Sequence, residues 1–256
     1  MRAPRRFRPD RVSPRLARTE AGERTELWTE SAGAPPPVYG ERWSVSEGRP
    51  YRAFDPFRAK LAAAIVRGWE GPLPRPGERW LYLGAASGTT ASHVADLVGP
   101  DGRVYAVERS VRPFARLADL SDRWPNLLPI LSDARVPRSY SELVPPVDGL
   151  YVDIAQPDQL EILKANAELF LSGAKDSLLL ALKTASMGRE LGPAGHLARA
   201  ERELEPWVDA FPSVKLDPFH RAHYLVGGAV RSALFGKSGE PRPSSPRARF
   251  PERRRR

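Results

Sequence analysis

The chain has 256 residues, of which 41% are hydrophobic, and it carries a formal net charge of +9 at pH 7. It contains no cysteine and only four histidines, which excludes disulfides and cysteine-ligated metal sites and argues against a histidine-rich metal centre. No run approaches the roughly eighteen apolar residues that a membrane span requires, and no signal peptide is recognisable, so we expect no association with a membrane.

The basic charge is concentrated at the two ends of the chain. Residues 1–20 carry a net +5 and residues 237–256 a net +6, which leaves a net −2 for everything between them. Such arginine-rich ends are either solvated tails or contacts for RNA phosphates, and composition leaves both open. We expect residues 1–25 to be weakly ordered and residues 236–256 to be a disordered tail rich in arginine and proline.

Two folded units are expected between these ends. Residues 26–50 combine a short strand pattern at 26–30 with a proline run and a turn rich in serine and glycine, which favours a small β-rich unit. Residues 51–235 follow as the main domain. Its first helix is predicted to have Asp55 as N-cap and Pro56 as the first helical residue, and to continue to about Trp69.

Strand and helix patterns alternate through the rest of the main domain. The strands expected there lie at 79–83, 103–107, 127–131, 149–153 and 177–183. The helices expected between and after them lie at 90–98, 113–123, 159–171 and 194–210. This alternation predicts an α/β fold with a parallel sheet covered on both faces. Two closing strands, at 213–216 and 223–230, are joined by a short link and are expected to be antiparallel.

A glycine loop follows the first of these strands. It reads Gly-Ala-Ala-Ser-Gly-Thr-Thr at 84–90 and opens the next helix. Small residues allow a ligand to approach the backbone, and the free N–H groups of a helix start favour polar or anionic groups. The G-x-x-x-G spacing favours S-adenosylmethionine, whereas a nicotinamide cofactor would require G-x-G-x-x-G. A nicotinamide-dependent dehydrogenase is the alternative that this spacing disfavours.

Two acidic residues follow the next two strands. Glu108 ends the second strand, 24 residues after Gly84, where its carboxylate is placed to accept hydrogen bonds from a ribose. Asp133 follows the third strand, where it is placed to bind an adenine amino group. Both strengthen the prediction of an adenosine-containing ligand at the carboxyl ends of the strands.

With these motifs aligned, the sequence resembles the fibrillarin family, and especially its archaeal forms, over about residues 26–230. The most specific matches are Val-Tyr-Gly-Glu-Arg at 38–42 and Tyr-Val-Asp-Ile-Ala-Gln-Pro at 151–157. Further matches lie at 51–52, 55–63, 84–90, 104–108 and 133–135. The resemblance implies a seven-stranded, Rossmann-like class I methyltransferase domain carrying a small β-rich N-terminal unit.

The same resemblance implies an activity and a set of partners. The activity is S-adenosylmethionine-dependent 2′-O-methylation of ribose in rRNA and tRNA, by the catalytic subunit of a box C/D guide ribonucleoprotein. The implied partners are the guide RNA, the substrate RNA, a Nop-family scaffold protein and a kink-turn-binding protein of ribosomal type. The implied location is cytoplasmic in an archaeal-type cell, and nucleolar only in a eukaryote. The residues between the two basic ends carry almost no net charge. This fits the scheme, because base pairing with the guide RNA selects the target RNA.

The resemblance also assigns site residues. Its catalytic constellation corresponds to Lys60, Asp153, Lys183 and His223, with His220 as a rival for the histidine position. The cofactor-binding residues that it implies are Gly84, Ala86, Gly88, Thr89, Thr90, Glu108, Arg109, Asp133, Ala134, Asp153, Ile154, Ala155 and Gln156, and no metal is expected. This sequence departs from the family pattern at Ala59, where serine is usual, after Lys183, and at Arg109, where an aromatic residue is more common.

Methyl transfer to a hydroxyl requires alignment and removal of the hydroxyl proton. Lys183 is the candidate for the group acting on that proton, which requires that its pKa be lowered by burial or by a cation such as Lys60. Asp153 is expected to orient Lys183 and the methyl group, while Lys60 and His223 hold the substrate phosphate or ribose. Two other functions stay open: an inactive scaffold that binds RNA or protein, and a methyltransferase of protein glutamine.

Overall fold

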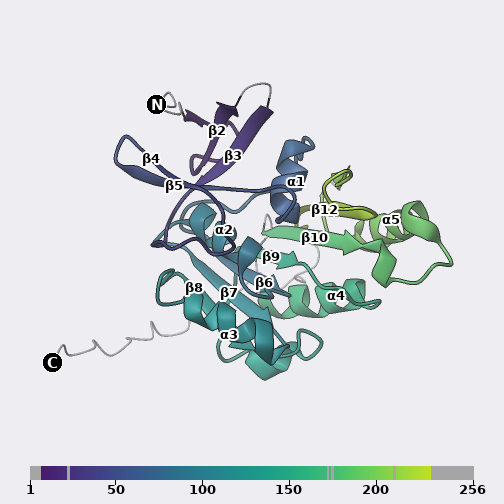
Figure 1. Ribbon diagram of the computed structural model, residues 1–256. Helices are drawn as coiled ribbons and strands as arrows, with labels where there is room; N and C mark the ends of the chain where they lie inside the picture. The colour runs from purple at the N-terminus through teal and green to yellow at the C-terminus, as the bar shows by residue number, and fades with distance from the viewer. Residues whose placement is uncertain (1–6, 22–23, 172, 174–175, 210–211, 232–256) are drawn as a thin grey trace.

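The computed structural model of the chain describes residues 7–231, apart from 22–23, 172, 174–175 and 210–211. These residues form a seven-stranded sheet with helices on both faces and, at the N-terminal end, a five-stranded antiparallel sheet (Figure 1). None of the helices in this part of the chain is long and apolar enough to cross a membrane.

The large sheet has the strand order β11-β12-β10-β9-β6-β7-β8. Its parallel strands are β6 (Arg79–Leu83), β7 (Arg103–Glu108), β8 (Leu127–Leu131), β9 (Gly149–Val152) and β10 (Ser177–Lys183). The sheet closes with β11 (Ser213–Lys215) and β12 (His223–Ala229), which pair antiparallel to each other, as β12 does with β10. The predicted parallel sheet with an antiparallel closing pair is therefore confirmed.

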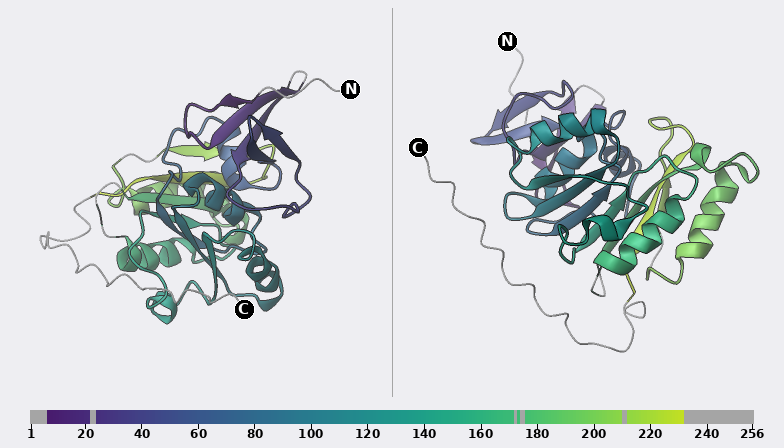
Figure 2. Two further views of the ribbon diagram at one scale, coloured as in Figure 1. Left: turned by 90° about the vertical axis from the view of Figure 1, so that its left-hand side faces the viewer. Right: turned by 90° about the horizontal axis from the view of Figure 1, so that it is seen from below.

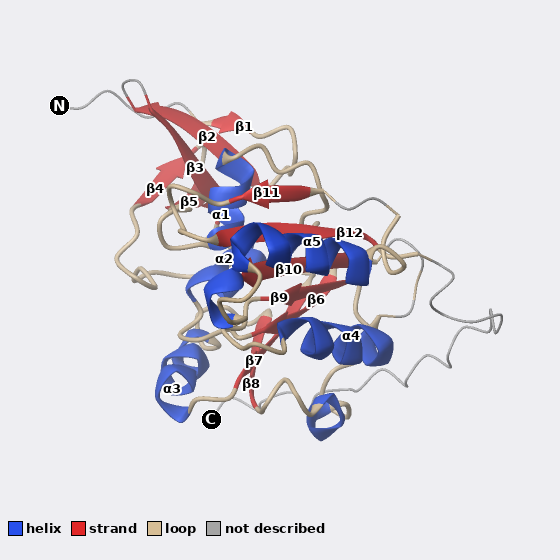
Figure 3. Cartoon of the chain, turned by 90° about the vertical axis from the view of Figure 1, so that its right-hand side faces the viewer, coloured by secondary structure: helices blue, strands red, loops and turns tan. Residues whose placement is uncertain are grey.

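Helices cover the two faces of this sheet (Figures 2 and 3). One face packs against α1 (Lys60–Val66), α2 (Thr89–Val98) and α3 (Val111–Leu120), and the other against α4 (Gln159–Phe170) and α5 (Gly192–Leu204). Short 3₁₀ turns occur at η1 (Pro137–Tyr140) and η2 (Thr184–Ser186). Strand residues alternate between the two cores: Trp80 and Tyr82 point to the first, Leu81 and Leu83 to the second. A strand buried on both faces is typical of a parallel sheet.

The first helix begins four residues later than the sequence indicated, at Lys60 instead of Pro56. Asp55 closes a turn in which its side-chain Oδ1 accepts a hydrogen bond from the Phe57 backbone N–H at 2.8 Å. Its carbonyl accepts hydrogen bonds from the N–H groups of Arg58 and Ala59. Ala59 is extended, with φ −129° and ψ 119°, so the turn and α1 are separate. The predicted N-cap at Asp55 was wrong, and Lys60 is instead the first residue of the helix.

The N-terminal sheet is larger than predicted. Its strands are β1 (Arg8–Pro9), β2 (Leu16–Ala21), β3 (Arg24–Glu30), β4 (Trp43–Ser46) and β5 (Arg49–Ala53). The prediction of weak order for residues 1–25 was wrong for β1 and β2, because β2 pairs with β3 along its whole length and buries Leu16, Ala17 and Thr19. The predicted disorder of residues 1–6 and 236–256 concerns positions outside the described residues.

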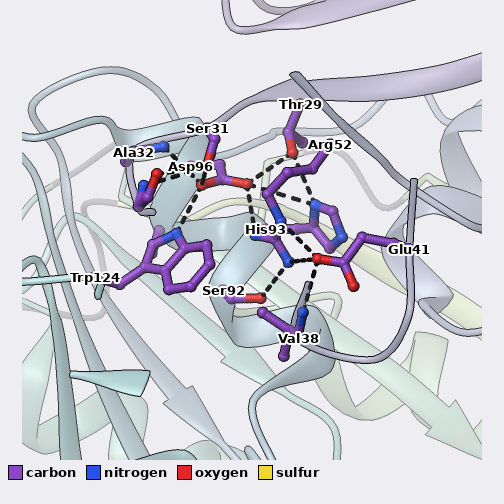
Figure 4. Close-up of polar contacts among 12 residues, drawn as sticks. Thr29, Ser31, Ala32, Val38, Glu41, Arg52, Ser92, His93, Asp96 and Trp124 are labelled. Atoms are coloured by element: carbon purple, nitrogen blue, oxygen red, sulfur yellow. Dashed lines mark hydrogen bonds and ion pairs between the residues drawn. The ribbon is translucent and has the colours of Figure 1, made fainter. Parts of the chain in front are cut away.

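A buried polar network joins the N-terminal sheet to α2 (Figure 4). Asp96 of α2 is its centre: its carboxylate accepts hydrogen bonds from Thr29 Oγ1 at 2.8 Å, Trp124 Nε1 at 2.9 Å and Arg52 Nη1 at 2.9 Å. Arg52 also pairs with Glu41, and all three charged side chains are fully buried. The network therefore attaches the N-terminal sheet to the helix that begins at the glycine loop.

Candidate active site

A cavity of about 520 Å³ opens at the carboxyl ends of β6, β7, β8, β9 and β10, within the usual size range of small-molecule sites. Loops that follow these strands line it, together with the start of α1. Residues predicted to bind the cofactor that line the cavity are Gly84, Ala86, Thr89, Thr90, Glu108, Arg109, Asp133, Ala134, Asp153, Ile154, Ala155 and Gln156. The parallel sheet brings them together because the carboxyl ends of its strands share one edge.

The glycine loop has a backbone shape that larger residues would disturb. Gly84 has φ +82°, and a Cβ added there would lie 2.5 Å from the carbonyl oxygen of Asp153. Glu108 braces the same loop: its Oε2 accepts a hydrogen bond from the Ala86 N–H at 2.9 Å, and its Oε1 one from the Ser110 N–H at 2.7 Å. Gly88 does not line the cavity; it is the N-cap of α2, at φ +87°. Gly88 therefore contributes to the shape of the loop and not to the wall of the cavity.

The far end of the cavity carries Asp133 and arginines. Asp133 Oδ2 lies 3.6 Å from Arg109 Nη1, and its Oδ1 accepts a hydrogen bond from the Arg135 N–H at 3.0 Å. The Arg135 guanidinium donates to Asp158 at 2.7 Å and to Gln156 Oε1 at 2.7 Å. Arg135 therefore ties the loop after β8 to the loop after β9. The sequence marked it only as part of an Asp-Ala-Arg run, because its partners lie more than twenty residues away.

Asp153 forms the centre of a cluster of ions at the other end. Its Oδ1 lies 2.7 Å from Lys183 Nζ and 3.1 Å from Lys60 Nζ. Lys183 Nζ also donates to the Asp153 backbone carbonyl at 2.9 Å, and Tyr82 OH donates to Asp153 Oδ2 at 3.1 Å. All four residues line the cavity. The structure therefore brings three residues of the predicted constellation together, and adds Tyr82, which the sequence did not single out.

The environment of this cluster changes how its groups ionise. Burial raises the pKa of Asp153, but the ammonium groups of Lys60 and Lys183 outweigh it and lower that pKa to about 2. Burial is also the largest influence on Lys183, and the charge of Lys60 acts with it, so its pKa is lowered although Asp153 opposes the change. Asp153 is thus a firm carboxylate, and Lys183 loses its proton more readily than an ordinary lysine.

Both candidate histidines lie beside this cluster. His223 is directly opposite Lys183 in the β10–β12 ladder, and such pairs place their side chains next to each other. Its pKa is lowered by burial first and by the charges of Lys60 and Lys183. His220, whose ring centre is 6.0 Å from that of His223, has a pKa lowered by burial and by Lys60. Neither lines the cavity, so both lie next to the lysines but outside its wall.

The cavity has no counterpart of a metal centre. Among the residues that the structure describes, no group of three or more His, Cys, Asp or Glu side chains is arranged to hold a metal ion. Among the polar groups that line the cavity are the carboxylates of Glu108 and Asp133, and the two lysines with Asp153 between them. This arrangement suits a ligand with hydroxyl and amino donors, next to a place where a proton is removed.

Comparison with known families gives one result throughout. The family model described as Fibrillarin matches residues 16–232. The chain is 39% identical over 226 residues to the rRNA 2′-O-methyltransferase fibrillarin of Eremothecium gossypii, covering 83% of this chain and 69% of that protein. It is 40% identical over 188 residues to the fibrillarin-like rRNA/tRNA 2′-O-methyltransferase of Pyrococcus horikoshii, covering 73% of this chain and 82% of that protein.

Solved structures show the same similarity in three dimensions. Aeropyrum pernix fibrillarin, crystallised with natively bound S-adenosyl-L-methionine, superposes with a TM-score of 0.78 at 36% identity, covering 88% of this chain and 98% of that one. A chain of a fibrillarin/Nop5p complex superposes with a TM-score of 0.72 at 42% identity, covering 80% of this chain and 94% of that one. The similarity spans both the N-terminal sheet and the large sheet.

Proposed function

The chain belongs to the fibrillarin family, and we propose that it transfers a methyl group from S-adenosylmethionine to ribose 2′-hydroxyls of RNA. The relatives at 39% and 40% identity are named as rRNA and as rRNA/tRNA 2′-O-methyltransferases, which supports rRNA and tRNA as substrates. They come from a fungus and an archaeon, so the similarity does not select between a nucleolar and a cytoplasmic location.

One observation carries the chemistry: Asp153 bridges two lysines at the inner end of the cavity. Burying ions costs free energy because they lose their hydration. A buried carboxylate that holds two ammonium groups therefore favours an enzyme over an inactive scaffold. The lowered pKa of Lys183 is the property that a lysine needs in order to accept a proton near neutral pH. The cluster therefore supports an enzyme that removes a proton from its acceptor.

The cavity fits S-adenosylmethionine. Gly84 lets the loop after β6 pass close to the Asp153 carbonyl, where any Cβ would collide with it. The carboxylates of Glu108 and Asp133 suit ribose hydroxyls and an adenine amino group. The structure of the Aeropyrum pernix relative with natively bound S-adenosyl-L-methionine supports the same cofactor. When bound, it supplies an activated methyl group on a positively charged sulfur.

With the cofactor bound, each residue of the cluster would have its own role in methyl transfer. Asp153 holds Lys183 in place through two contacts, from Oδ1 and from its backbone carbonyl. Lys183 Nζ accepts the proton of the 2′-hydroxyl, and the adjacent charge of Lys60 favours its neutral form beforehand. Lys60 and His223 hold the substrate ribose or phosphate. Tyr82 donates a hydrogen bond from its hydroxyl to Oδ2, the second carboxylate oxygen of Asp153.

We further propose that the chain acts within a guided ribonucleoprotein. The similarity to a chain of the fibrillarin/Nop5p complex supports a Nop-family scaffold as a direct partner. A box C/D guide RNA and a kink-turn-binding protein complete the proposed assembly. This division of labour is compatible with a chain whose positive charge lies mostly at its two ends.

Reconstitution tests this proposal. The chain is combined with a Nop-family scaffold, a kink-turn-binding protein, a box C/D guide and radiolabelled S-adenosylmethionine, and methyl transfer to a matched RNA is measured. We expect label on the target nucleotide, none on an RNA with a 2′-deoxyribose there, and none with Lys183→Ala, which should still bind the cofactor. Cofactor binding without transfer to any RNA would contradict the proposal, and labelling of a protein glutamine would redirect it.

A further inference from the structure

Phe57 exposes an aromatic ring beside the candidate active site. It is 63% exposed, and it is the only aromatic residue among the strongly exposed large apolar residues of the described chain. An apolar side chain of this size in water carries a cost of hydration that covering it would remove. Its position three residues before Lys60 places it at the edge of the site.

The ring is held in position from two sides. On one side, the turn closed by Asp55 fixes the backbone, because the Phe57 N–H donates to Asp55 Oδ1 at 2.8 Å. On the other, Phe219 meets Phe57 edge to face, with ring centres 5.0 Å apart and planes at 78°. Phe219 itself packs against the hydrophobic core. A ring held before its partner arrives loses little side-chain entropy on binding.

The neighbours of the ring suit a nucleic acid. Arg58 is exposed and lines the cavity, and within the described part of the chain no carboxylate forms an ion pair with it. On the other side of the ring, His220 directly follows Phe219. Burial and the charge of Lys60 lower the pKa of His220. The Phe57 ring thus has Arg58 on one side and His220 on the other. No acidic side chain of the described residues forms an ion pair with Arg58.

We propose that Phe57 packs against the sugars next to the target nucleotide, in the minor groove of the duplex formed by guide and substrate, while Arg58 contacts a nearby phosphate. This inference rests on the proposed function. The minor groove of an A-form helix is wide and shallow and displays the 2′-hydroxyls, so a projecting ring can enter it. Phe57 is then a residue that binds the substrate RNA and holds the duplex next to the site.

The test uses four variants in the complete reconstituted assembly: Phe57→Ala, Phe57→Leu, Phe57→Tyr and a control at Leu143. Phe57→Ala should raise the KM for RNA about five- to thirtyfold, the range expected for losing burial of about two thirds of a phenyl side chain. Its kcat and its cofactor affinity, measured by calorimetry, should stay within about twofold of wild type. Phe57→Leu, which keeps the apolar bulk, should recover most of the loss. Leu143→Ala, at a residue that is 62% exposed and outside the cavity, is the matched control and should leave KM unchanged.

The outcomes separate the two proposals. A wild-type assembly that methylates no RNA overturns the proposed function before any variant is compared. An active wild type with an unchanged KM in Phe57→Ala overturns the role of Phe57 alone. If Phe57→Leu is as impaired as Phe57→Ala while Phe57→Tyr is fully active, the ring stacks on an unpaired base, and the minor-groove contact is wrong. An equal loss in Leu143→Ala also refutes a specific contact.

Discussion

Replacing Asp96 by Asn should loosen the attachment of the N-terminal sheet to α2. The Asp96 carboxylate is fully buried and accepts hydrogen bonds from Thr29, Trp124 and Arg52, as well as from the Ala32 N–H at 2.8 Å. An amide has nearly the same shape, but its nitrogen cannot accept a hydrogen bond. Arg52 would then face an N–H donor, and Glu41 would be the one carboxylate that still pairs with its charge among the contacts described above.

The size of the effect follows from these partners. Breaking a buried ion pair completely costs about 3–5 kcal/mol, and because Glu41 still pairs with Arg52 we expect the lower end, about 3 kcal/mol. For a chain of this length, that corresponds to a fall in melting temperature of about 6–12 °C. Equilibrium unfolding in guanidinium chloride, followed by circular dichroism, measures the free energy directly.

Asp101→Asn provides the control for Asp96→Asn. Asp101 follows α2, is exposed, and forms no ion pair within the described residues, so its replacement makes the same change in charge at a solvated position. Its free energy of unfolding should stay within about 0.5 kcal/mol of wild type. A loss below about 1 kcal/mol in Asp96→Asn, or equal losses in both variants, would refute the argument that the network holds the two sheets together.

Three further predictions concern the site itself. Gly84→Ala should weaken cofactor binding at least tenfold by calorimetry, because φ +82° disfavours a side chain and the new Cβ would lie 2.5 Å from the Asp153 carbonyl; wild-type affinity would contradict this. Lys60→Met should shift the rising limb of the kcat–pH profile to higher pH. The charge of Lys60 lowers the pKa of Lys183, which acts when neutral, so removing Lys60 raises that pKa. A limb that does not move would exclude Lys183 as the base. His223→Gln should raise the KM for RNA more than His220→Gln, because His223 lies opposite Lys183 in the sheet. A larger increase in His220→Gln would assign substrate binding to His220.

Several features could be read from the sequence because local signals carry them. The alternation of apolar strands and helices specified the parallel sheet, and the small residues at 84–90 marked the turn between β6 and α2. The position of Asp153 directly after a buried strand placed it at the ligand-binding edge. Lys183 closes the neighbouring strand, and parallel neighbours end at the same edge, so their proximity also followed. These inferences need only strand direction and spacing along the chain.

Other features depend on contacts between distant segments. The strand β2 was missed because Arg18 and Glu20 interrupt its apolar pattern, and only pairing with β3 reveals the side that is buried. The network around Asp96 joins residues more than forty positions apart, and Arg135 is recognisable as a tie between loops only once β8 and β9 are placed.

What the sequence determined by itself is therefore the order of elements in the main domain, the edge of the sheet that carries the candidate site, and the family. Only the tertiary structure decided that Lys60 starts its helix, that Asp153 holds both lysines, and that burial lowers the pKa of Lys183. The physical reason is that periodicity and turn chemistry act over a few residues, whereas ion pairs and desolvation depend on which surfaces meet in the folded chain.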